Sequence, residues 1–112
     1  MLTIFFHLWV KPGHEAESAK TVAEAVASTR AEDDGCINYA FYRERDEPRH
    51  LVLFEQWRDA DALNAHIERL QRVYGPPNER EPYPSTHHRR RLPKRFLALF
   101  EKTEAARYEP MS

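Results

Sequence analysis

Alternating apolar positions rich in β-branched and aromatic residues predict three strands. These strands cover residues 2–10, 36–44 and 50–57. The first, LTIFFHLWV, carries apolar side chains on both faces and ends just before the chain breaker Pro12-Gly13. Turn-forming residues at 45–49 separate the other two strands, which predicts that they pair as a hairpin.

Apolar residues at spacings of three and four predict two longer helices. The first covers residues 14–31, and Gly35 is a suitable terminator after its acidic end. Its apolar stripe is formed by Ala16, Ala19, Val22, Ala23, Val26 and Ala27. The second helix follows Asp59, which suits an N-cap, and its stripe contains Leu63, His66, Ile67, Leu70 and Tyr74.

The periodic pattern stops at residues 75–91, which hold four prolines and many polar residues. A loop of this length inside a compact domain is usually a functional lid or lacks fixed structure. We expect it to be an insertion within a single domain that spans residues 1–112. A short helix is expected in 92–104, with Pro93 near its first turn, and a last strand in 105–110.

The resulting order is β-α-β-β-α-β, with the extra loop and short helix before the last strand. This is the order of an α+β, ferredoxin-like fold. Such a fold leaves one face of its four-stranded antiparallel sheet without helices. Because the predicted strands carry large apolar residues on both sides, that face is too apolar to remain in water. We therefore expect a homodimer in which two sheets pack face to face.

Composition narrows the possible classes of function. The 112 residues carry a net charge of −1 and a pI near 6.6, which argues against general nucleic-acid binding. No apolar run approaches the ~20 residues of a membrane span. Cys36 is the only cysteine, so an intramolecular disulfide is excluded. The N-terminus lacks the basic region of a signal peptide, and we expect a cytoplasmic protein.

The segment DDGCINYAFYRERDEPRHLVLFEQWRDADALNAHI, residues 33–67, resembles the antibiotic biosynthesis monooxygenase family of dimeric α+β barrels. The resembling features are Gly35-Cys36, Glu55-x-Trp57, Ala62-Leu63-x-x-His66 and the earlier Lys11-Pro12-Gly13. The resemblance extends over about residues 2–70. It implies a pocket between the helices and the sheet. It also implies, as in some members, oxidation of phenolic or quinol substrates by O₂ with no metal or flavin.

Haem-degrading relatives use an asparagine on the first strand and a tryptophan where this chain has His66. Phe6 lies near the first of these positions, so the resemblance argues against haem chemistry. It implies instead a cofactor-independent monooxygenase that acts on a small aromatic, phenolic or quinol compound. The alternative is a non-catalytic ligand-binding or stress-response protein, because both functions need an apolar pocket with a few polar groups.

A cofactor-independent oxygenase needs an apolar cavity, a base and donors that hold the substrate anion. His66 is the candidate catalytic base, because the ordinary pKa of histidine is about 6.5. Its alternative role is structural, as a group that caps polar atoms or pairs with Glu55.

The candidates for substrate contact are Trp57, His7, Asn38, Tyr39, Phe54 and Tyr74. Trp57 would stack on a planar substrate or fill the core. His7 would line the pocket or face the partner sheet, and Asn38 would bind a substrate oxygen or stabilise a strand end. The other three aromatic side chains would form pocket walls and part of a lid.

The run THHRRR at 86–91 contains two adjacent histidines, and its three arginines form a basic cluster with Lys94 and Arg95. Adjacent histidines point in different directions, and no third ligand stands at a recognisable spacing. We therefore expect no metal site here. A solvated charged loop is also expected in preference to a nucleic-acid partner.

Overall fold

The computed structural model describes residues 1–77 and 92–112. Its elements are β1 (Leu2–Val10), α1 (Glu15–Glu32), β2 (Cys36–Arg43), β3 (His50–Trp57), α2 (Ala60–Tyr74), α4 (Lys94–Leu97) and β4 (Phe100–Tyr108). The predicted α+β, ferredoxin-like fold class is therefore confirmed. Most of the predicted loop 75–91, with its lid and the three arginines of the basic cluster, lies outside the described residues, whereas Lys94 and Arg95 of that cluster are exposed on α4. Within the described part of the chain, no helix has the length and apolar character needed to cross a membrane.

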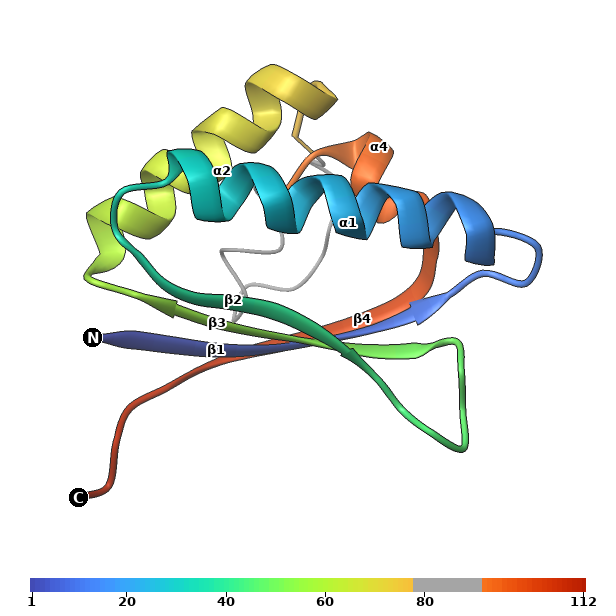
Figure 1. Ribbon diagram of the computed structural model, residues 1–112, viewed down its shortest axis with the longest axis horizontal. Coiled ribbons are helices and arrows are strands. Elements are labelled where there is room, and N and C mark those ends of the chain that lie inside the picture. The colour runs from blue at the N-terminus through green and yellow to red at the C-terminus, as the bar shows by residue number, and fades with distance from the viewer. Residues whose placement is uncertain (78–91) are drawn as a thin grey trace.

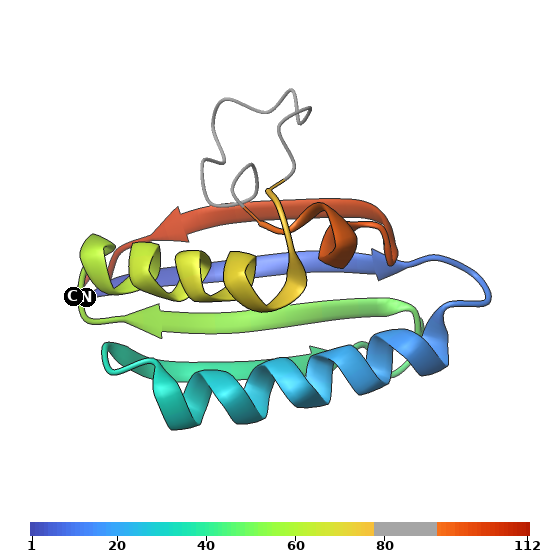
Figure 2. The ribbon, with the colours of Figure 1, turned by 90° about the horizontal axis from the view of Figure 1, so that it is seen from above.

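One antiparallel sheet with the strand order β2-β3-β1-β4 forms the base of the molecule. The predicted hairpin is confirmed, since β2 pairs with β3 from Cys36 opposite Trp57 to Arg43 opposite Leu51, with an irregularity between Cys36 and Asn38. The described helices all lie on one side of the sheet, as Figure 1 shows. In Figure 2, α2 lies over the middle of the sheet, and α1 runs along the β2 edge. The opposite face of the sheet carries no described helix.

The hydrophobic core lies between the sheet and the helices. Strand alternation turns one set of β1 side chains toward the helices, and each is at most 3% exposed: Ile4, Phe6, Leu8 and Val10. The apolar stripe of α2 packs onto them, as predicted, with Leu63, Ile67 and Leu70. Phe96 of α4 closes the core at the β4 side. The strong amphipathic pattern of α2 thus explains its central place over the sheet.

Helix α1 buries a different face from the predicted alanine and valine stripe. Its fully buried residues are Ser18, Ala25 and Thr29. Of the predicted stripe, Val26 packs partly buried against the core and Val22 is half-buried, but its alanines are exposed, so the buried face is rotated from the predicted one. The physical reason is the position of α1 along the sheet edge, where small side chains suffice for close packing. Ala19 and Ala23, which belong to the predicted stripe, border an open cleft instead.

The C-terminal segment also differs from its prediction. The helix has only four residues, and the strand begins at Phe100 rather than at residue 105. β4 pairs with β1 in a register that places Thr3 opposite Tyr108 and Val10 opposite Phe100. Strand pairing with distant β1 satisfies the backbone of this segment, which overrides its weak local helical pattern.

Candidate functional site

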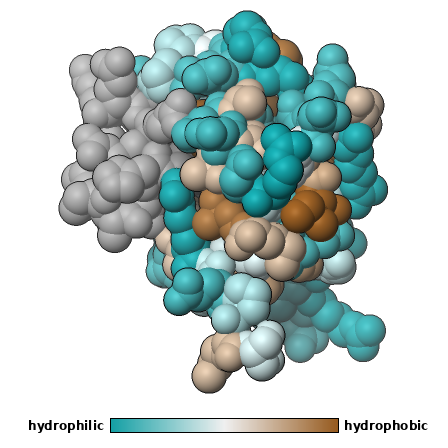
Figure 3. All heavy atoms as spheres, turned by 90° about the vertical axis from the view of Figure 1, so that its left-hand side faces the viewer, coloured by the Kyte–Doolittle hydropathy of each residue, from teal (hydrophilic) through white to brown (hydrophobic). Residues whose placement is uncertain are grey.

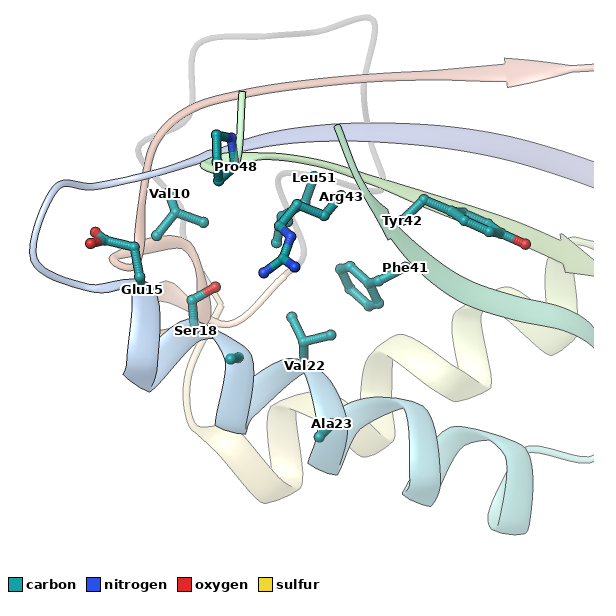
Figure 4. Close-up of a pocket in the computed structure, with 11 residues that line it drawn as sticks. Val10, Glu15, Ser18, Val22, Ala23, Phe41, Tyr42, Arg43, Pro48 and Leu51 are labelled. Atoms are coloured by element: carbon teal, nitrogen blue, oxygen red, sulfur yellow. The ribbon is translucent and has the colours of Figure 1, made fainter. Parts of the chain in front are cut away.

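An open cleft of about 420 Å³ lies between α1 and the β2 end of the sheet. Figure 4 shows its residues, which come from β1, α1, β2, β3 and the turn between β2 and β3. Most of its walls are apolar and are formed by Val10, Ala19, Val22, Ala23, Phe41 and Leu51. A concave and mostly apolar site of this size suits a small organic ligand.

Among the described residues, three polar side chains face this cleft, whereas Tyr42, which also borders it, turns its hydroxyl away in Figure 4. Ser18 is 2% exposed, and its hydroxyl has no hydrogen-bond partner among the described residues. The exposed Arg43 ends β2, and Figure 4 shows its guanidinium turned from the sheet toward α1. The Glu15 carboxylate accepts a hydrogen bond of 2.7 Å from the Gly13 backbone N–H. The cleft therefore combines apolar walls with one cationic, one anionic and one hydroxyl group.

A second hollow, of about 340 Å³, lies where α1 ends and α2 begins. Its lining is mostly charged and includes Asp33, Asp34, Arg58, Asp61, Arg69 and Arg72, together with His66. Figure 3 views this end of the molecule, where hydrophilic side chains cover most of the surface. Such a lining suits charged groups and water better than a planar apolar ligand.

Asp33 joins α1 to α2 through a buried network. His66 Nδ1 donates to Asp33 Oδ2 over 2.6 Å. Arg69 donates from Nε to Oδ1 over 2.7 Å and from Nη2 to Oδ2 over 2.9 Å, and Nη2 also reaches Thr29 Oγ1 at 3.2 Å. The His66 and Asp33 side chains are 1% and 7% exposed. This geometry makes Asp33 the shared acceptor between the helices.

The charge of Asp33 is stabilised by these partners. Burial alone would raise the pKa of this carboxyl, but the hydrogen bonds and charges of His66 and Arg69 lower its pKa to about 2. The same hydrogen bonds raise the pKa of Arg69 above its ordinary value. An ionised carboxylate only accepts hydrogen bonds, so the proton in the 2.6 Å contact is on His66 Nδ1. Asp33 thus sets the orientation of the imidazole, as the carboxylate of a catalytic triad does.

Aromatic rings pack around His66. The Trp57 and Tyr39 ring centroids lie 4.5 and 5.2 Å from that of His66. Trp57 Nε1 donates to Glu55 Oε1 over 3.0 Å, and both side chains are fully buried. Burial and the nearby Glu55 charge raise the pKa of Tyr39 well above its ordinary value. The structure therefore brings three predicted site residues, His66, Trp57 and Tyr39, into one buried cluster.

Three other predicted residues lie on the helix-free face of the sheet. His7 lies on this face rather than in the pocket between helices and sheet, and its Nδ1 is 3.0 Å from His50 Nε2. Phe54 stacks on Phe5 with a centroid distance of 5.3 Å. The Asn38 amide donates to Gln56 on the neighbouring strand. These side chains cannot contact a ligand in the α1–β2 cleft, because the sheet lies between them.

Tyr74, the last predicted substrate contact, ends α2. Its ring lies 6.4 Å from that of Phe96 in an edge-on contact, so it packs against α4. Burial raises the pKa of its hydroxyl. Its predicted partners in a lid lie outside the described residues.

Residues able to bind a metal occur at the β2–β3 turn. Among the described residues, Glu44, Glu47 and His50 place ligand atoms within 4.8 Å of one another. His50 Nδ1 lies 2.7 Å from Glu44 Oε1, so the imidazole already has a partner. The pair His87-His88, considered above as metal ligands, lies outside the described residues.

Sequence reasoning did not single out Asp33, Ser18 or Arg43. A signal for Arg43 was available, because strand alternation places it on the same face as Tyr39 and Phe41. Asp33 contacts a histidine 33 positions away, and this pairing has no local signal. The buried place of Ser18 depends on the rotation of α1, which the alanine-rich pattern did not determine.

Comparisons with known proteins agree with this architecture. The 23% identical PA3566 from Pseudomonas aeruginosa has a TM-score of 0.70, and the match covers 99% of this chain and 94% of that chain. Rv0793 from Mycobacterium tuberculosis is 20% identical, with a TM-score of 0.69 and coverages of 99% and 95%. A crystal structure of an antibiotic biosynthesis monooxygenase is 21% identical, with a TM-score of 0.72 and full coverage of both chains. At these identities the likeness concerns the fold.

Sequence similarity supplies the family. The protein sll1783 from Synechocystis is 34% identical over 59 residues, which are 53% of this chain and 40% of that relative. The chain thus matches less than half the length of this curated relative. The model of the antibiotic biosynthesis monooxygenase family matches residues 1–70. Because this match covers more than half of the 112 residues, the chain belongs to the antibiotic biosynthesis monooxygenase family.

Proposed function

We propose that this protein is a monooxygenase that oxidises a small aromatic, phenolic or quinol compound with O₂ in the α1–β2 cleft. The reaction would use no metal or organic cofactor. Family membership supports the reaction class. The observation that carries the choice of site is the apolar lining of the 420 Å³ cleft, which contrasts with the charged hollow beside His66.

The chemistry requires an electron-rich carbanion or phenolate. For a substrate with an activated CH₂ group, loss of a proton gives an anion that transfers an electron to O₂. Recombination forms a C–O bond and, after protonation, a hydroperoxide. Loss of the second C–H proton with cleavage of the O–O bond leaves a C=O group and releases water. The substrate supplies all four electrons, and the two atoms of O₂ end in the product and in water.

The cleft supports two of the needs of this reaction. Its aliphatic walls would shield one side of the reactive anion from water, and Phe41 offers an aromatic surface for a planar ring. Its polar groups, Ser18, Arg43 and Glu15, are few enough to orient one substrate. The remaining need is a way to remove a proton from the substrate, so that the reactive anion forms.

His66 is the residue predicted to remove this proton as a base. A base must come within about 2.6–3.2 Å of the proton it removes, directly or through one water. His66 does not line the cleft, and the rings of Phe41 and Tyr39 lie between, with centroid distances of 6.0 Å for Phe41–Tyr39 and 5.2 Å for Tyr39–His66. This geometry favours the structural role of His66, which holds Asp33 between α1 and α2.

The alternative function is binding of a small hydrophobic ligand without turnover. One observation favours it: among the described residues that line the cleft, Glu15 is the only carboxylate, and no histidine is present. A ligand-binding protein needs no base, so the same cleft would serve both functions.

Oxygen consumption separates the two functions. Metal-stripped protein is assayed against hydroquinones, anthrones and catechols, beside an Ala23→Phe variant that fills the cleft. Ala27→Phe is the matched control, because Ala27 is exposed on the same helix and does not line the cleft. The proposal expects uptake above the uncatalysed rate in the wild type and the control, and its loss in Ala23→Phe. Equal uptake in all three proteins would contradict this site, and no uptake on any compound would favour the binding function.

We also propose that the helix-free face of the sheet mediates a homodimer. Its apolar side chains include Phe5, which is 37% exposed, and Tyr108, which is 50% exposed, and their rings meet edge to face at 5.2 Å. Phe54 extends this aromatic surface on β3. A second copy would bury these rings against an identical surface, as a two-fold interface requires.

A further inference from the structure

The polar groups of the α1–β2 cleft indicate the charge of its ligand. We propose that the cleft binds a small aromatic oxyanion whose charged oxygen pairs with the Arg43 guanidinium and accepts a hydrogen bond from the Ser18 hydroxyl. The location rests on the proposed function, but the inference concerns binding and can be tested without turnover. Phenolates and aromatic carboxylates share this chemistry.

Ser18 supplies the first argument. A buried hydroxyl without a hydrogen bond has lost its bonds to water and gained none in return, so folded proteins contain few such groups. The Ser18 side chain is 2% exposed, and its oxygen has no partner among the described residues. Figure 4 shows this hydroxyl on the α1 wall, directed into the cleft. A ligand oxygen in the cleft would satisfy it.

Arg43 supplies the second argument. It ends β2 on the same face as Phe41, so its side chain leaves the sheet on the side of α1. No ion pair joins it to any other residue in the described ranges 1–77 and 92–112. The guanidinium is always charged and presents donors in a planar fork that matches an oxyanion. An apolar cleft bordered by a cation that has no ion pair within the described ranges is electrostatically complementary to an anion with an apolar body.

Glu15 limits the number of charges on the ligand. Among the described residues it is the only other charged side chain that lines the cleft, and its carboxylate is held by the Gly13 N–H at 2.7 Å. A second negative group on the ligand would be repelled near the start of α1. The cleft therefore favours a monoanion with one charged end and an otherwise apolar body.

This arrangement also offers a route to the reactive anion. A neighbouring opposite charge favours the ionised form of an acid and lowers its pKa by about 1–3. Arg43 would therefore favour a bound phenolate over the phenol, and the phenolic proton would go to water. Oxygenation in the cleft would then need no histidine in contact with the substrate. Since Arg43 is exposed, we expect the lower end of this range.

Binding of matched nitro-aromatic probes tests the inference. The probes are 4-nitrophenol, 4-nitrobenzoate and the neutral nitrobenzene, measured by calorimetry above the pKa of each acid. We expect at least one anion to bind at least ten-fold more tightly than nitrobenzene. The anion that binds more tightly shows whether the cleft prefers a phenolate or an aromatic carboxylate. Absorbance titration of bound 4-nitrophenol is expected to show a pKa lowered by about 1.

Three variants test the residues. Arg43→Gln is expected to weaken anion binding about ten-fold or more, and Ser18→Ala about three- to ten-fold, with little effect on nitrobenzene. Arg45→Gln is the control, because it makes the same charge change on an exposed residue that does not line the cleft. Equal binding of neutral and anionic probes would overturn the inference. An Arg45→Gln loss as large as that of Arg43→Gln would do so as well.

The outcomes separate this inference from the proposed function. Selective anion binding without O₂ uptake on any compound would retain the oxyanion site and reject the oxygenase. O₂ uptake that is blocked by Ala23→Phe and unchanged in Arg43→Gln would retain the oxygenase and reject the oxyanion site. Circular dichroism verifies folding, which both binding variants should preserve because neither side chain has a partner within the described residues.

Discussion

Replacement of Asp33 by asparagine tests the buried link between α1 and α2. The carboxylate accepts hydrogen bonds from His66 at 2.6 Å and from Arg69 at 2.7 and 2.9 Å. Asparagine preserves the size of the side chain but removes its charge and one acceptor oxygen. The Arg69 guanidinium, whose side chain is 11% exposed, then loses its main counter-ion.

The expected destabilisation follows from the pKa of Asp33. Lowering of this pKa from 3.8 to about 2 corresponds to about 2 kcal/mol at neutral pH, since one pKa unit is about 1.4 kcal/mol. Removal of one partner from a buried ion pair typically costs about 3–5 kcal/mol. Arg69 keeps contacts with Glu32 at 3.6 Å and with Thr29 at 3.2 Å, which reduces the loss. We expect Asp33→Asn to lower the free energy of unfolding by about 2–4 kcal/mol at pH 6.

The effect should depend on pH in a defined direction. Because the pKa of Asp33 is lower in the folded protein, the unfolded chain binds the proton more readily. The stabilisation is therefore complete above about pH 5 and is lost as the pH falls through 3.8 toward about 2. About half of it should remain at pH 3. The variant has no carboxyl at this position, so its difference from the wild type should shrink over the same range.

Urea unfolding at pH 6, 5, 4 and 3 measures this difference. Protein concentration is held constant, because a dimer would make stability depend on it. Asp34→Asn is the matched control, since the neighbouring Asp34 is exposed, and its effect should stay within about 0.5 kcal/mol. A loss below about 1 kcal/mol at pH 6, or a difference that does not change down to pH 3, would refute the reasoning.

Four further predictions concern other parts of the molecule. Gly35→Ala should cost about 1–3 kcal/mol in urea unfolding, because the new Cβ would collide with that of Ala62; an unchanged midpoint would argue against this close approach. His66→Ala should lose stability and keep residual turnover, whereas unchanged stability with lost turnover would assign His66 as the base. Phe54→Glu should give a monomer by light scattering if the sheet face forms the dimer, and an undiminished mass would exclude this interface. Asp59→Ala should cost about 1 kcal/mol in thermal unfolding, because its side chain caps α2 at Ala62 N over 2.8 Å; an equal Tm would show that the cap contributes nothing.

Local patterns in the sequence were sufficient for much of the fold. Strands β1 and β3 have the bounds that alternation and flanking turn residues predicted, and α2 begins directly after its predicted N-cap Asp59. These signals depend on a few consecutive residues, so they can be recognised without knowing which elements pack nearby. The order of the elements then limited the topology to the ferredoxin-like arrangement.

The C-terminal strand needed the tertiary structure. Residues 100–108 carry a mixed pattern, and only pairing with β1 decides that they are extended from Phe100 onward. The rotation of α1 had the same origin, since Ser18 and Thr29 are buried because α1 packs at the sheet edge.

The candidate site shows the same division in more detail. Strand alternation established that His7 and Phe5 share a face, but the side covered by helices is decided when α1 packs on β2 and α2 packs on β3. Only that packing separates His7 from His66 and places Arg43 beside the cleft. The sequence by itself determined the strands, the second helix and the family resemblance, because these follow from short-range patterns. The tertiary structure decided which polar side chains meet, because the contact of Asp33 with His66 joins residues 33 positions apart, and no local pattern encodes it.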